Sequence, residues 1–325
     1  MRNPRSLTAM LAAAALCVPL ATAPAAAQQF PSRTITVVVP NAPGGPNDFL
    51  ARLMANKLEP KIGQSVVVEN RPGGATYTGG AYVARAVPDG HTLLVNAYSG
   101  MEPHLFMKGL ELNLSRELVP VAPLSEQPFL VYGPTAMPAT NLKEFVAYAK
   151  ANPGKANVAI FPGTSSGLEM LDFIKATGIN VLTVPFNSTS AIMVAMLRND
   201  VQLYNGGIGG PKAQIEAGKI RGLAVLGSKR DPALPNVPTA KELGFDWESS
   251  VYYVVFAPAK TPAAIVNQLN ELINAVMHDP DTVARANAGG NPPAPAVTPQ
   301  QMAARLARET AALEKSVKDN NIQPQ

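Results

Sequence analysis

The chain has 325 residues, and a chain of this length usually folds around two hydrophobic cores. Its 27 lysines and arginines nearly balance 23 aspartates and glutamates, so it lacks the concentrated positive charge that nucleic-acid binding requires. Three scattered histidines and one cysteine provide no cluster of metal ligands. We therefore expect no metal, no other cofactor and no nucleic-acid partner.

The first 27 residues have the features of an export signal that is removed. Two arginines lie near the start, an apolar alanine-rich run covers residues 7–23, and residues 25–27 are the small residues that a signal peptidase prefers. We expect cleavage before Gln28 and delivery to the periplasm. A membrane anchor is the alternative, but the apolar run is short and contains Pro19. Cys17 lies in this segment, so the mature chain would have no thiol.

The segment after the signal is the most informative part of the sequence. A predicted buried strand at residues 34–40 leads into a turn with Gly44 and Gly45, and an amphipathic helix follows at residues 49–58. The first N–H groups of a helix lack intrahelical partners and, with the helix dipole, favour an anion that glycine allows to approach closely. We predict an anion-binding loop here. The alternative is a tight turn in which Asp48 only complements the helix dipole.

Short β-rich runs alternate with helical patterns along the rest of the chain, which is typical of α/β layers over mostly parallel sheets. Asn141 followed by Glu144 predicts a capped helix start, and two Thr-Pro pairs predict further helices capped by Thr261 and Thr298. Turns are expected at the prolines of residues 120–138, around an apolar run. The other predicted strands are residues 65–69, 91–96, 157–161, 180–184, 201–204, 222–226 and 251–256, and the other predicted helices are residues 77–86, one ending at Thr177, 191–197 and 212–217.

The predicted strand at residues 251–256 is expected to return the chain to its first domain. Domain 1 would then comprise residues 28–127 plus 251–325, and domain 2 residues 128–250, joined by two strand-like crossings. Two domains joined in this way enclose a cleft that holds small molecules and closes by a hinge motion.

Residues 163–167 fit the pattern G-x-S-x-G between a predicted strand and a predicted helix, the context of an esterase nucleophile. Ser165 would then need an acid and a histidine downstream. His278 is the one histidine after it, whereas His91 and His104 precede it. We favour a binding role, in which the hydroxyl and N–H groups of this turn hydrogen-bond a ligand oxygen.

Several stretches, in order along residues 30–280, resemble one protein family. They include Val-Pro-x-Ala-Pro-Gly-Gly-x-x-Asp at residues 39–48 and Gly-Gln-Ser-Val-Val-Val-Glu-Asn-Arg-Pro-Gly at residues 63–73. Further matches lie at residues 30–33, 83–94, 149–155, 217–225, 234–239 and 256–262. The family is that of the tripartite tricarboxylate transporter receptors, also called Bug or TctC-like proteins.

The resemblance implies an α/β, type II periplasmic-binding-protein-like fold, with two α/β domains and a ligand cleft between them. In the family, the loop corresponding to residues 41–48 holds a ligand carboxylate, partly through ordered waters, and the turn at residues 163–166 meets it from the other lobe. The loop after the third strand, the loop at 186–189 and the strand end at 205 also line the cleft by position. The expected ligand-binding residues are Asn41, Ala42, Gly44, Gly45, Asp48, Tyr98, Ser99, Gly163, Thr164, Ser165, Ser166, Asn187, Ser188 and Asn205.

Departures from the family pattern leave the solute open. Relatives usually have Val-Pro-Tyr-Lys-Gly where this chain has Val-Pro-Phe-Asn-Ser at residues 184–188, and often an aspartate where it has Asn205. The resemblance implies that the missing aspartate removes a contact that some relatives use for amino groups. Tyr252 replaces a common tryptophan, and Tyr98 either stacks on an aromatic ligand or fills the core.

We therefore expect a periplasmic solute-binding protein, not an enzyme, that acts as a monomer and captures a small carboxylated organic solute, either aromatic or a di- or tricarboxylate. The implied partners are that solute and the membrane subunits of a tripartite tricarboxylate transporter. A secreted hydrolase that uses Ser165 and a ligand sensor for a signalling protein are the alternatives. Lysine and arginine are scarce in the proposed loops, so backbone and hydroxyl donors are the expected contacts. Each hydrogen bond from such a donor to an ionised acceptor contributes about 1.5–3 kcal/mol.

Overall fold

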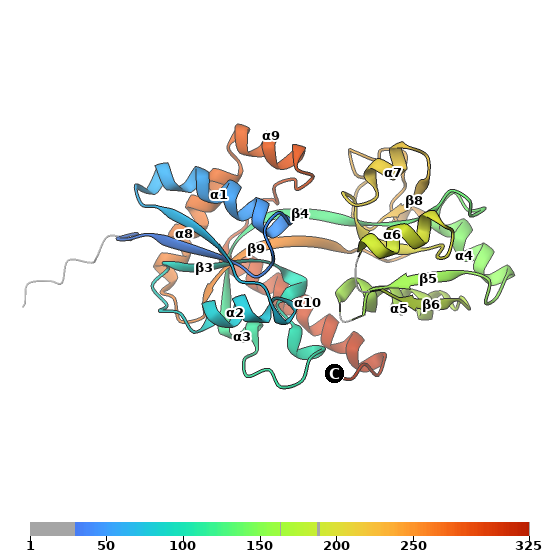
Figure 1. Cartoon of the computed structure of the whole chain (residues 1–325), viewed down its shortest axis with the longest axis horizontal. Helices are drawn as coiled ribbons and strands as arrows, with labels where there is room; N and C mark the ends of the chain where they lie inside the picture. Colours follow the sequence, from blue (N-terminus) through green and yellow to red (C-terminus); the bar gives the residue numbers. More distant parts are fainter. Residues whose placement is uncertain (1–29, 163, 187–188, 325) are drawn as a thin grey trace, which may run out of the picture.

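The computed structural model describes residues 30–162, 164–186 and 189–324. Two α/β lobes are joined by two strands, β4 (Leu118–Pro134) and β9 (Ser250–Pro258), which run between them in Figure 1. β4 pairs with β9 as far as Pro128 and with two lobe 2 strands from Phe129 onward. β4 therefore changes its partners between Pro128 and Phe129.

Lobe 1 is built on a mixed sheet with the strand order β2-β1-β3-β9-β4. β1 (Ile35–Val39) lies parallel to β2 (Val66–Asn70) and to β3 (Thr92–Ala97), with Val37 between Val68 and Leu93. β9 runs antiparallel to both β3 and β4. The apolar run of β1 is typical of a strand that is covered on both faces.

Helices cover both faces of the lobe 1 sheet. On one face α1 and α8 pack around Leu50 and Leu269, and on the other face α2, α3 and α10 pack around Leu94 and Leu114. The helices and 3-10 turns of this lobe are α1 (Pro46–Ile62), η1 (Gly74–Thr76), α2 (Tyr77–Ala84), η2 (Tyr98–Gly100), η3 (Pro103–Leu105), α3 (Leu114–Glu117), α8 (Ala263–Met277), α9 (Pro280–Ala288) and α10 (Pro299–Asp319).

Lobe 2 extends β4 into a second layered sheet. β7 (Tyr204–Gly207) and β8 (Ile220–Val225) both lie antiparallel to β4, and β5 (Asn157–Ile160) lies parallel to β6 (Leu182–Pro185). A parallel bridge between Val158 and Leu203 connects β5 to the chain entering β7. The helices of this lobe are α4 (Leu142–Ala151), α5 (Ser165–Thr177), α6 (Thr189–Leu197), α7 (Lys212–Glu216) and the 3-10 turn η4 (Lys241–Leu243).

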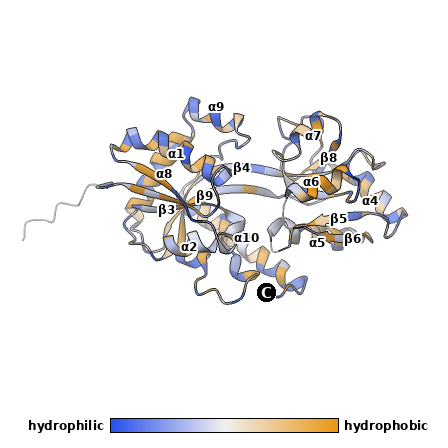
Figure 2. Ribbon diagram, viewed as in Figure 1, coloured by the Kyte–Doolittle hydropathy of each residue, from blue (hydrophilic) through white to orange (hydrophobic). Residues whose placement is uncertain are grey.

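The two lobes have separate hydrophobic cores. The buried apolar clusters around Leu50 and Leu94 consist of lobe 1 residues, and those around Phe145 and Tyr132 consist of lobe 2 residues. Figure 2 shows apolar residues on the strands and on the helix sides that face them. Within residues 30–162, 164–186 and 189–324 no helix is both long and apolar enough to cross a membrane.

α10 begins in lobe 1 and reaches lobe 2. Asp172 of α5 accepts hydrogen bonds from Ser316 Oγ at 2.6 Å and from Asn320 Nδ2 at 2.7 Å. In Figure 1 this helix passes alongside the two crossing strands. The C-terminal helix is therefore a third connection between the lobes.

The turns predicted around residues 120–138 are wrong for most of that range. β4 is one strand of 17 residues that contains Pro120, Pro123 and Pro128. Its register with β9 shifts after Pro120 and again after Pro123. Such irregularities accommodate residues that have no N–H to donate to the ladder.

Three smaller predictions are also wrong, and one helix was missed. The N-cap of α8 is Pro262, with no side-chain cap, so Thr261 does not cap it. The strand expected at residues 201–204 lies at Tyr204–Gly207, because the first two residues of the glycine cluster pair with β4. α9, capped by Asp279, was not predicted. The sheets are mixed, not mostly parallel, because β4 and β9 cross between the lobes in opposite directions.

The start of α10 agrees with the prediction and supports a test. Thr298 Oγ1 accepts the Gln301 N–H at 3.2 Å, and Gln301 Oε1 accepts the Thr298 N–H at 2.9 Å. Thr298→Ala removes this capping box and is expected to lower the free energy of unfolding by about 1 kcal/mol. Urea unfolding measures the loss, and Thr298→Ser, which keeps the hydroxyl, should restore most of it. An equal loss in both variants would show that the hydroxyl does not matter.

Candidate functional site

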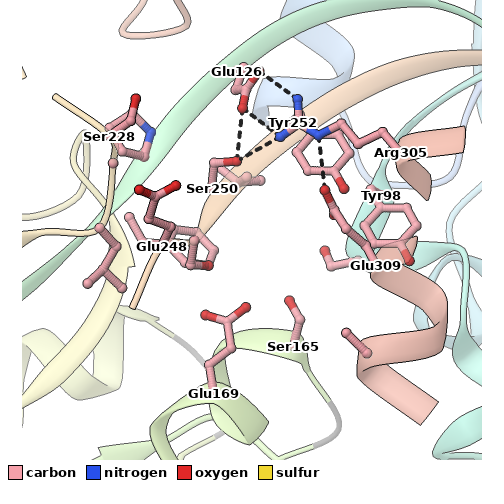
Figure 3. Close-up of a pocket in the computed structure, with 18 of the residues that line it drawn as sticks. Tyr98, Glu126, Ser165, Glu169, Ser228, Glu248, Ser250, Tyr252, Arg305 and Glu309 are labelled. Atoms are coloured by element: carbon pink, nitrogen blue, oxygen red, sulfur yellow. Dashed lines mark hydrogen bonds and ion pairs between the residues drawn. The ribbon is translucent and has the colours of Figure 1, made fainter. Parts of the chain in front are cut away.

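A cavity of about 800 Å³ lies between the two lobes. The crossing segments of β4 and β9 form one wall, α5 and α10 form others, and the loop after β8 lies at one side. In Figure 3 the side chains of Ser165 and Glu169 point from α5 toward the crossing strand that carries Ser250. The side chains of Arg305 and Glu309 extend from α10. Because both lobes contribute walls, a hinge motion would change the width of this cavity.

The start of α5 presents hydrogen-bond donors to the cavity. Thr164 is the N-cap, since its Oγ1 accepts the Gly167 N–H at 3.2 Å, and it donates to the Phe161 carbonyl at 2.7 Å. Ser166 Oγ lies 3.1 Å from Thr164 Oγ1, so both hydroxyls are engaged within the turn. Ser165 lines the cavity at the first residue of the helix. The hydroxyl of Ser165 and the positive end of the helix dipole therefore face a position suited to an anion.

The loop at residues 41–48 is held in shape by Asp48. Asp48 Oδ2 accepts the Gly44 N–H at 3.0 Å, and Asp48 Oδ1 lies 2.9 Å from Asn70 Nδ2 and 2.9 Å from Arg52 Nη2. The hydrogen bonds from Arg52, Gly44 and Asn70 outweigh burial and lower the pKa of Asp48. The Gly44 N–H thus donates to the carboxylate of Asp48 within the turn. Gly45, the N-cap of α1, has open space around its Cβ position.

Buried amides connect this loop to the end of β3. Asn47 Nδ2 donates to Asn41 Oδ1 and also lies 3.4 Å from Asn96 Oδ1. Asn96 Nδ2 in turn lies 3.3 Å from Thr76 Oγ1. Because Asn96 precedes Tyr98 by two residues, this network ties the loop to a segment that lines the cavity.

Tyr98 belongs to the core and also lines the cavity. It is 7% exposed, its ring stacks on Tyr252 with 5.3 Å between centroids and 7° between planes, and its hydroxyl lies 2.8 Å from Thr310 Oγ1. The guanidinium of Arg305 lies 4.3 Å from the centroid of the Tyr252 ring, a cation–π contact. Of the two roles left open for Tyr98, the structure favours packing in the core.

Arg305 joins α10 to both crossing strands. Its Nη1 and Nη2 atoms donate to the two oxygens of Glu126 on β4, at 2.9 and 2.7 Å, and Nη2 also donates to Ser250 Oγ on β9 at 3.3 Å. Its Nε donates to Glu309 at 3.0 Å. Burial opposes ionisation of Glu126, but the hydrogen bonds and charge of Arg305 outweigh it and lower the pKa of Glu126. The guanidinium of Arg305 therefore holds α10 against β4 and β9 where these two strands cross between the lobes.

Two other carboxyl groups at the cavity are held closer to their neutral form. Burial, together with the charges of Glu126 and Glu169, raises the pKa of Glu309 to about 8. Burial raises the pKa of Glu169 to about 7. Glu169 Oε2 is buried and has no hydrogen-bond partner in the part of the chain that the structure describes.

These raised pKa values predict a dependence of stability on pH. A glutamate with the ordinary pKa of 4.5 in the unfolded chain ionises well before these two groups do in the folded protein. Between that pH and about 8 the folded protein binds more protons, so the free energy of unfolding decreases as pH rises through this window. Thermal unfolding should show Tm falling from about pH 5 to about pH 9, with a shallower slope in Glu309→Gln. Glu271→Gln, on the exposed side of α8, is the control, and an unchanged slope in Glu309→Gln would contradict the assignment.

The structure brings only part of the predicted site to this cavity. Tyr98, Ser99 and Ser165 line it. Asn205 of β7 lies opposite Val131, is 1% exposed, and its Nδ2 has no partner among the described residues. Gly163, Asn187 and Ser188 lie outside the described residues. The predicted residues that are described but do not line this cavity are Asn41, Ala42, Gly44, Gly45, Asp48, Thr164, Ser166 and Asn205.

Sequence reasoning missed the charged residues of the cavity. Glu169 had a detectable signal, because it follows Ser165 by one turn on the same predicted helix. Arg305 and Glu309 also stand four residues apart on a predicted helix. Nothing local in the sequence indicates that this helix packs over the crossing strands beside Glu126.

The described residues do not assemble a hydrolytic centre at Ser165. The described residues that line the cavity include no histidine. His91 lies 3.2 Å from Asp89, and His278 Nδ1 lies 2.9 Å from the Asn274 carbonyl oxygen, so each has a partner elsewhere. The glycine at position 167 has a packing reason, because a Cβ atom there would lie 2.2 Å from the Phe161 carbonyl oxygen. The described residues also contain no group of three or more histidine, cysteine or acidic residues that could hold a metal ion.

Comparison with known proteins connects this architecture to one family. The model of the tripartite tricarboxylate transporter family receptor matches residues 50–321. The protein BugT of Bordetella pertussis is 31% identical over 296 residues, which cover 88% of this chain and 89% of BugT.

Solved structures agree with this match. MatC of Rhodopseudomonas palustris with bound malate is 31% identical, with a TM-score of 0.71, and the match covers 89% of this chain and 100% of MatC. An R. palustris protein with adipate is 29% identical, with a TM-score of 0.76, and the match covers 91% of this chain and 100% of that protein. The predicted fold class and the predicted family are both confirmed. The chain belongs to the family of tripartite tricarboxylate transporter receptors, whose members are solute-binding proteins of the periplasm.

Proposed function

We propose that this protein captures a small carboxylated organic solute between its lobes and presents it to the membrane subunits of a tripartite tricarboxylate transporter. The observation that carries the proposal is the position of the α5 N-terminus, with Ser165, in the wall of a cavity built by both lobes. A helix N-terminus favours a negatively charged group. The relatives that hold malate and adipate support a dicarboxylate among the candidates.

The predicted binding residues divide between the lobes. Lobe 1 would contribute the backbone around Gly45 and the segment at Tyr98 and Ser99, and lobe 2 would contribute the α5 turn and Asn205. The amide network that links the loop at residues 41–48 to Asn96 supports this grouping, because Asn96 is next to the segment that lines the cavity. A solute that contacts both lobes stabilises their closed arrangement, and that arrangement is the form that a membrane partner would recognise.

The N-terminal segment supports export. The signal peptide would be cleaved before Gln28 and the mature protein would act in the periplasm as a monomer that binds its solute without transforming it. A sensor that reports its bound ligand to a signalling protein would close around the ligand in the same way. Transport and sensing differ in the partner that recognises the closed form, which is a membrane subunit in one case and a signalling protein in the other.

A ligand screen tests the proposal. Purified residues 28–325 are heated with and without a panel of mono-, di- and tricarboxylates, each matched by sodium chloride of equal ionic strength. A solute whose free concentration is 100 times its Kd raises the free energy of unfolding by about 2.7 kcal/mol. At least one acid should therefore raise Tm by several degrees. If no acid of the panel stabilises the protein, the proposed function is wrong. Turnover of an ester substrate that is lost in Ser165→Ala would instead establish the hydrolase.

A further inference from the structure

Two residues in the segment after β2 hold the backbone in a conformation that their side chains disfavour. Ala75 has φ 48° and Thr76 has φ 79°, both in the left-handed region. Among the described residues other than glycine, Asn199 and Asn321 also occupy this region, and asparagine tolerates it well. A β-branched residue such as threonine is a clear outlier there. Strain of this kind persists where the surrounding structure fixes it, and it is concentrated at functional sites.

The hydrogen bonds of the Thr76 hydroxyl offset this strain. Thr76 Oγ1 donates to the Gly100 carbonyl oxygen at 2.8 Å and accepts from Asn96 Nδ2 at 3.3 Å. Asn96 Nδ2 also lies 3.3 Å from the same carbonyl oxygen. Asn96 is fully buried, so its amide relies on protein partners and not on water. The three residues therefore form one hydrogen-bonded group.

This group joins segments that follow three neighbouring strands of lobe 1. Thr76 follows β2, and Asn96 and Gly100 lie at the end of β3. Asn96 Oδ1 lies 3.4 Å from Nδ2 of Asn47, which starts α1 after β1. β1 runs parallel to both β2 and β3, so the three strands end at the same edge of the sheet. In open α/β sheets, ligands bind in the crevice outside this edge.

The end of β3 connects the group to the interlobe cavity. A Cβ atom at Gly100 would lie 2.7 Å from both Asn96 Nδ2 and Thr76 Oγ1, so the side chains fit closely around this glycine. Ser99, the preceding residue, lines the cavity, whereas Thr76 and Asn96 do not. A displacement of Thr76 would therefore move a cavity wall that Thr76 itself does not form.

Helix α2 connects Thr76 to the loop after β1 by a second route. Gly79 lies in the first turn of α2, and a Cβ atom there would lie 2.9 Å from Pro40 Cβ. Pro40 directly precedes the loop at residues 41–48. The backbone N–H of Arg71 also donates to the Val39 carbonyl oxygen at 2.8 Å. The segment that carries Thr76 is therefore held against the start of that loop.

We propose that Thr76 and Asn96 are positioning residues for solute binding. They fix the loop at residues 41–48 and the segment at Tyr98 and Ser99 in the relative arrangement that the solute requires. This inference rests on the proposed function and deepens it, because it gives two residues outside the cavity wall a role in affinity. The loss of the Thr76 hydroxyl should therefore weaken binding by the folded protein, beyond any effect on stability.

Substitutions at Thr76 separate affinity from stability. Isothermal titration calorimetry measures Kd for malate, adipate and the other acids of the panel, and the acid that the unmodified protein binds most tightly is used for every variant. Thr76→Val keeps the β-branched shape and the backbone strain but lacks the hydroxyl, and should raise Kd about 10-fold or more. Thr76→Ser keeps the hydroxyl and should stay within about threefold.

Ala75→Gly is the matched control in the same turn. Ala75 is exposed, so this variant relieves backbone strain without removing a side chain of the hydrogen-bonded group. Its Kd should change by less than about twofold. Thermal unfolding of each free variant measures stability, and a purely structural role of the hydroxyl would lower Tm in Thr76→Val while leaving Kd unchanged.

Two further variants test whether the side chains act as one group. Asn96→Ala combined with Thr76→Val should lose about as much affinity as the weaker-binding single variant, because both changes break the same connection. Gly100→Ala keeps both side chains but forces them apart through its added Cβ atom, and should also raise Kd about 10-fold. This variant decides the outcome if Thr76→Val or Asn96→Ala does not fold.

An unchanged Kd in folded Thr76→Val, or in Gly100→Ala, would overturn the inference and leave the proposed function standing. A loss of affinity in Ala75→Gly equal to that in Thr76→Val would also overturn it, because the effect would then come from the backbone and not from the hydroxyl. Fully additive losses in the double variant would show that the two residues act separately. If no acid binds the unmodified protein, the proposed function is wrong and the inference is wrong with it.

Discussion

Replacing Gly45 by valine is expected to abolish the stabilisation of this protein by its solute while leaving the free protein folded. The backbone at Gly45 has φ −83° and ψ 173°, which valine adopts readily, and no atom lies within 4 Å of the Cβ position. The added side chain would occupy the space through which a carboxylate reaches the N–H groups at the start of α1. Losing two charge-assisted hydrogen bonds would cost about 3–6 kcal/mol of binding free energy, a loss of at least 100-fold in affinity.

The choice of position and controls makes this test specific. Gly44 has φ +92°, so a side chain there would strain the backbone and would also disturb the hydrogen bond to Asp48. Gly45→Ala should give a smaller loss than Gly45→Val, and Asn56→Val, on the exposed side of α1, should give none. Thermal shifts with the best acid of the panel measure all three variants. Full stabilisation of Gly45→Val would remove the loop at residues 41–48 from the binding site.

Arg305→Gln is expected to cause a large loss of stability. The variant removes the bidentate pair with Glu126 and the hydrogen bonds to Ser250 and Glu309, and it leaves the partly buried carboxylate of Glu126 without its counter-charge. The side chain of Glu126 is 26% exposed, so water compensates for part of the loss, and about 2–3 kcal/mol is a reasonable expectation. The corresponding fall in Tm is on the order of 5–10 °C.

A neighbouring arginine provides the matched control for this variant. Arg308 is exposed on the same helix, and Arg308→Gln should change stability by less than about 0.5 kcal/mol. Urea unfolding at pH 7 compares the two variants. At about pH 5 the deficit of Arg305→Gln should shrink, because burial without Arg305 favours protonation of Glu126, and protonation removes its unpaired charge. Equal losses in the two arginine variants would show that the contact with the crossing strands contributes nothing to stability.

Local signals account for the parts of the fold that the sequence predicted well. The apolar run of β1, the glycine turn after it and the apolar side of α1 are neighbours in the chain, and the structure has the strand and the helix where they were expected. Thr298 and Gln301 form the predicted capping box, and Asn141 accepts the Glu144 N–H at 3.0 Å. In these cases the interacting atoms are a few residues apart, so residue type and spacing are sufficient to predict the contact.

Contacts between residues far apart in the chain determine the parts of the structure that local sequence patterns did not predict. Pro120, Pro123 and Pro128 indicate turns by local rules, yet pairing with β9 along most of β4 outweighs that preference. Arg305 meets Glu126 across 179 residues, and Tyr98 meets Thr310 across 212, so no periodicity in the sequence identifies these pairs. The bond from the Gly44 N–H to Asp48 is local, since the two residues are four apart, but the sequence indicated only an interaction of Asp48 with the helix dipole.

The sequence by itself determined the α/β class, the family, the strand that leads into the loop at residues 41–48 and the start of the helix that carries Ser165. Each of these depends on short-range patterns or on ordered motifs along the chain. Only the tertiary structure decided which charges share the interlobe cavity, because α10 packs against the crossing strands and α5 through side chains that lie far apart in sequence. Electrostatic environment depends on distance in space and on burial, and both are set only when the two lobes and the last helix have packed together.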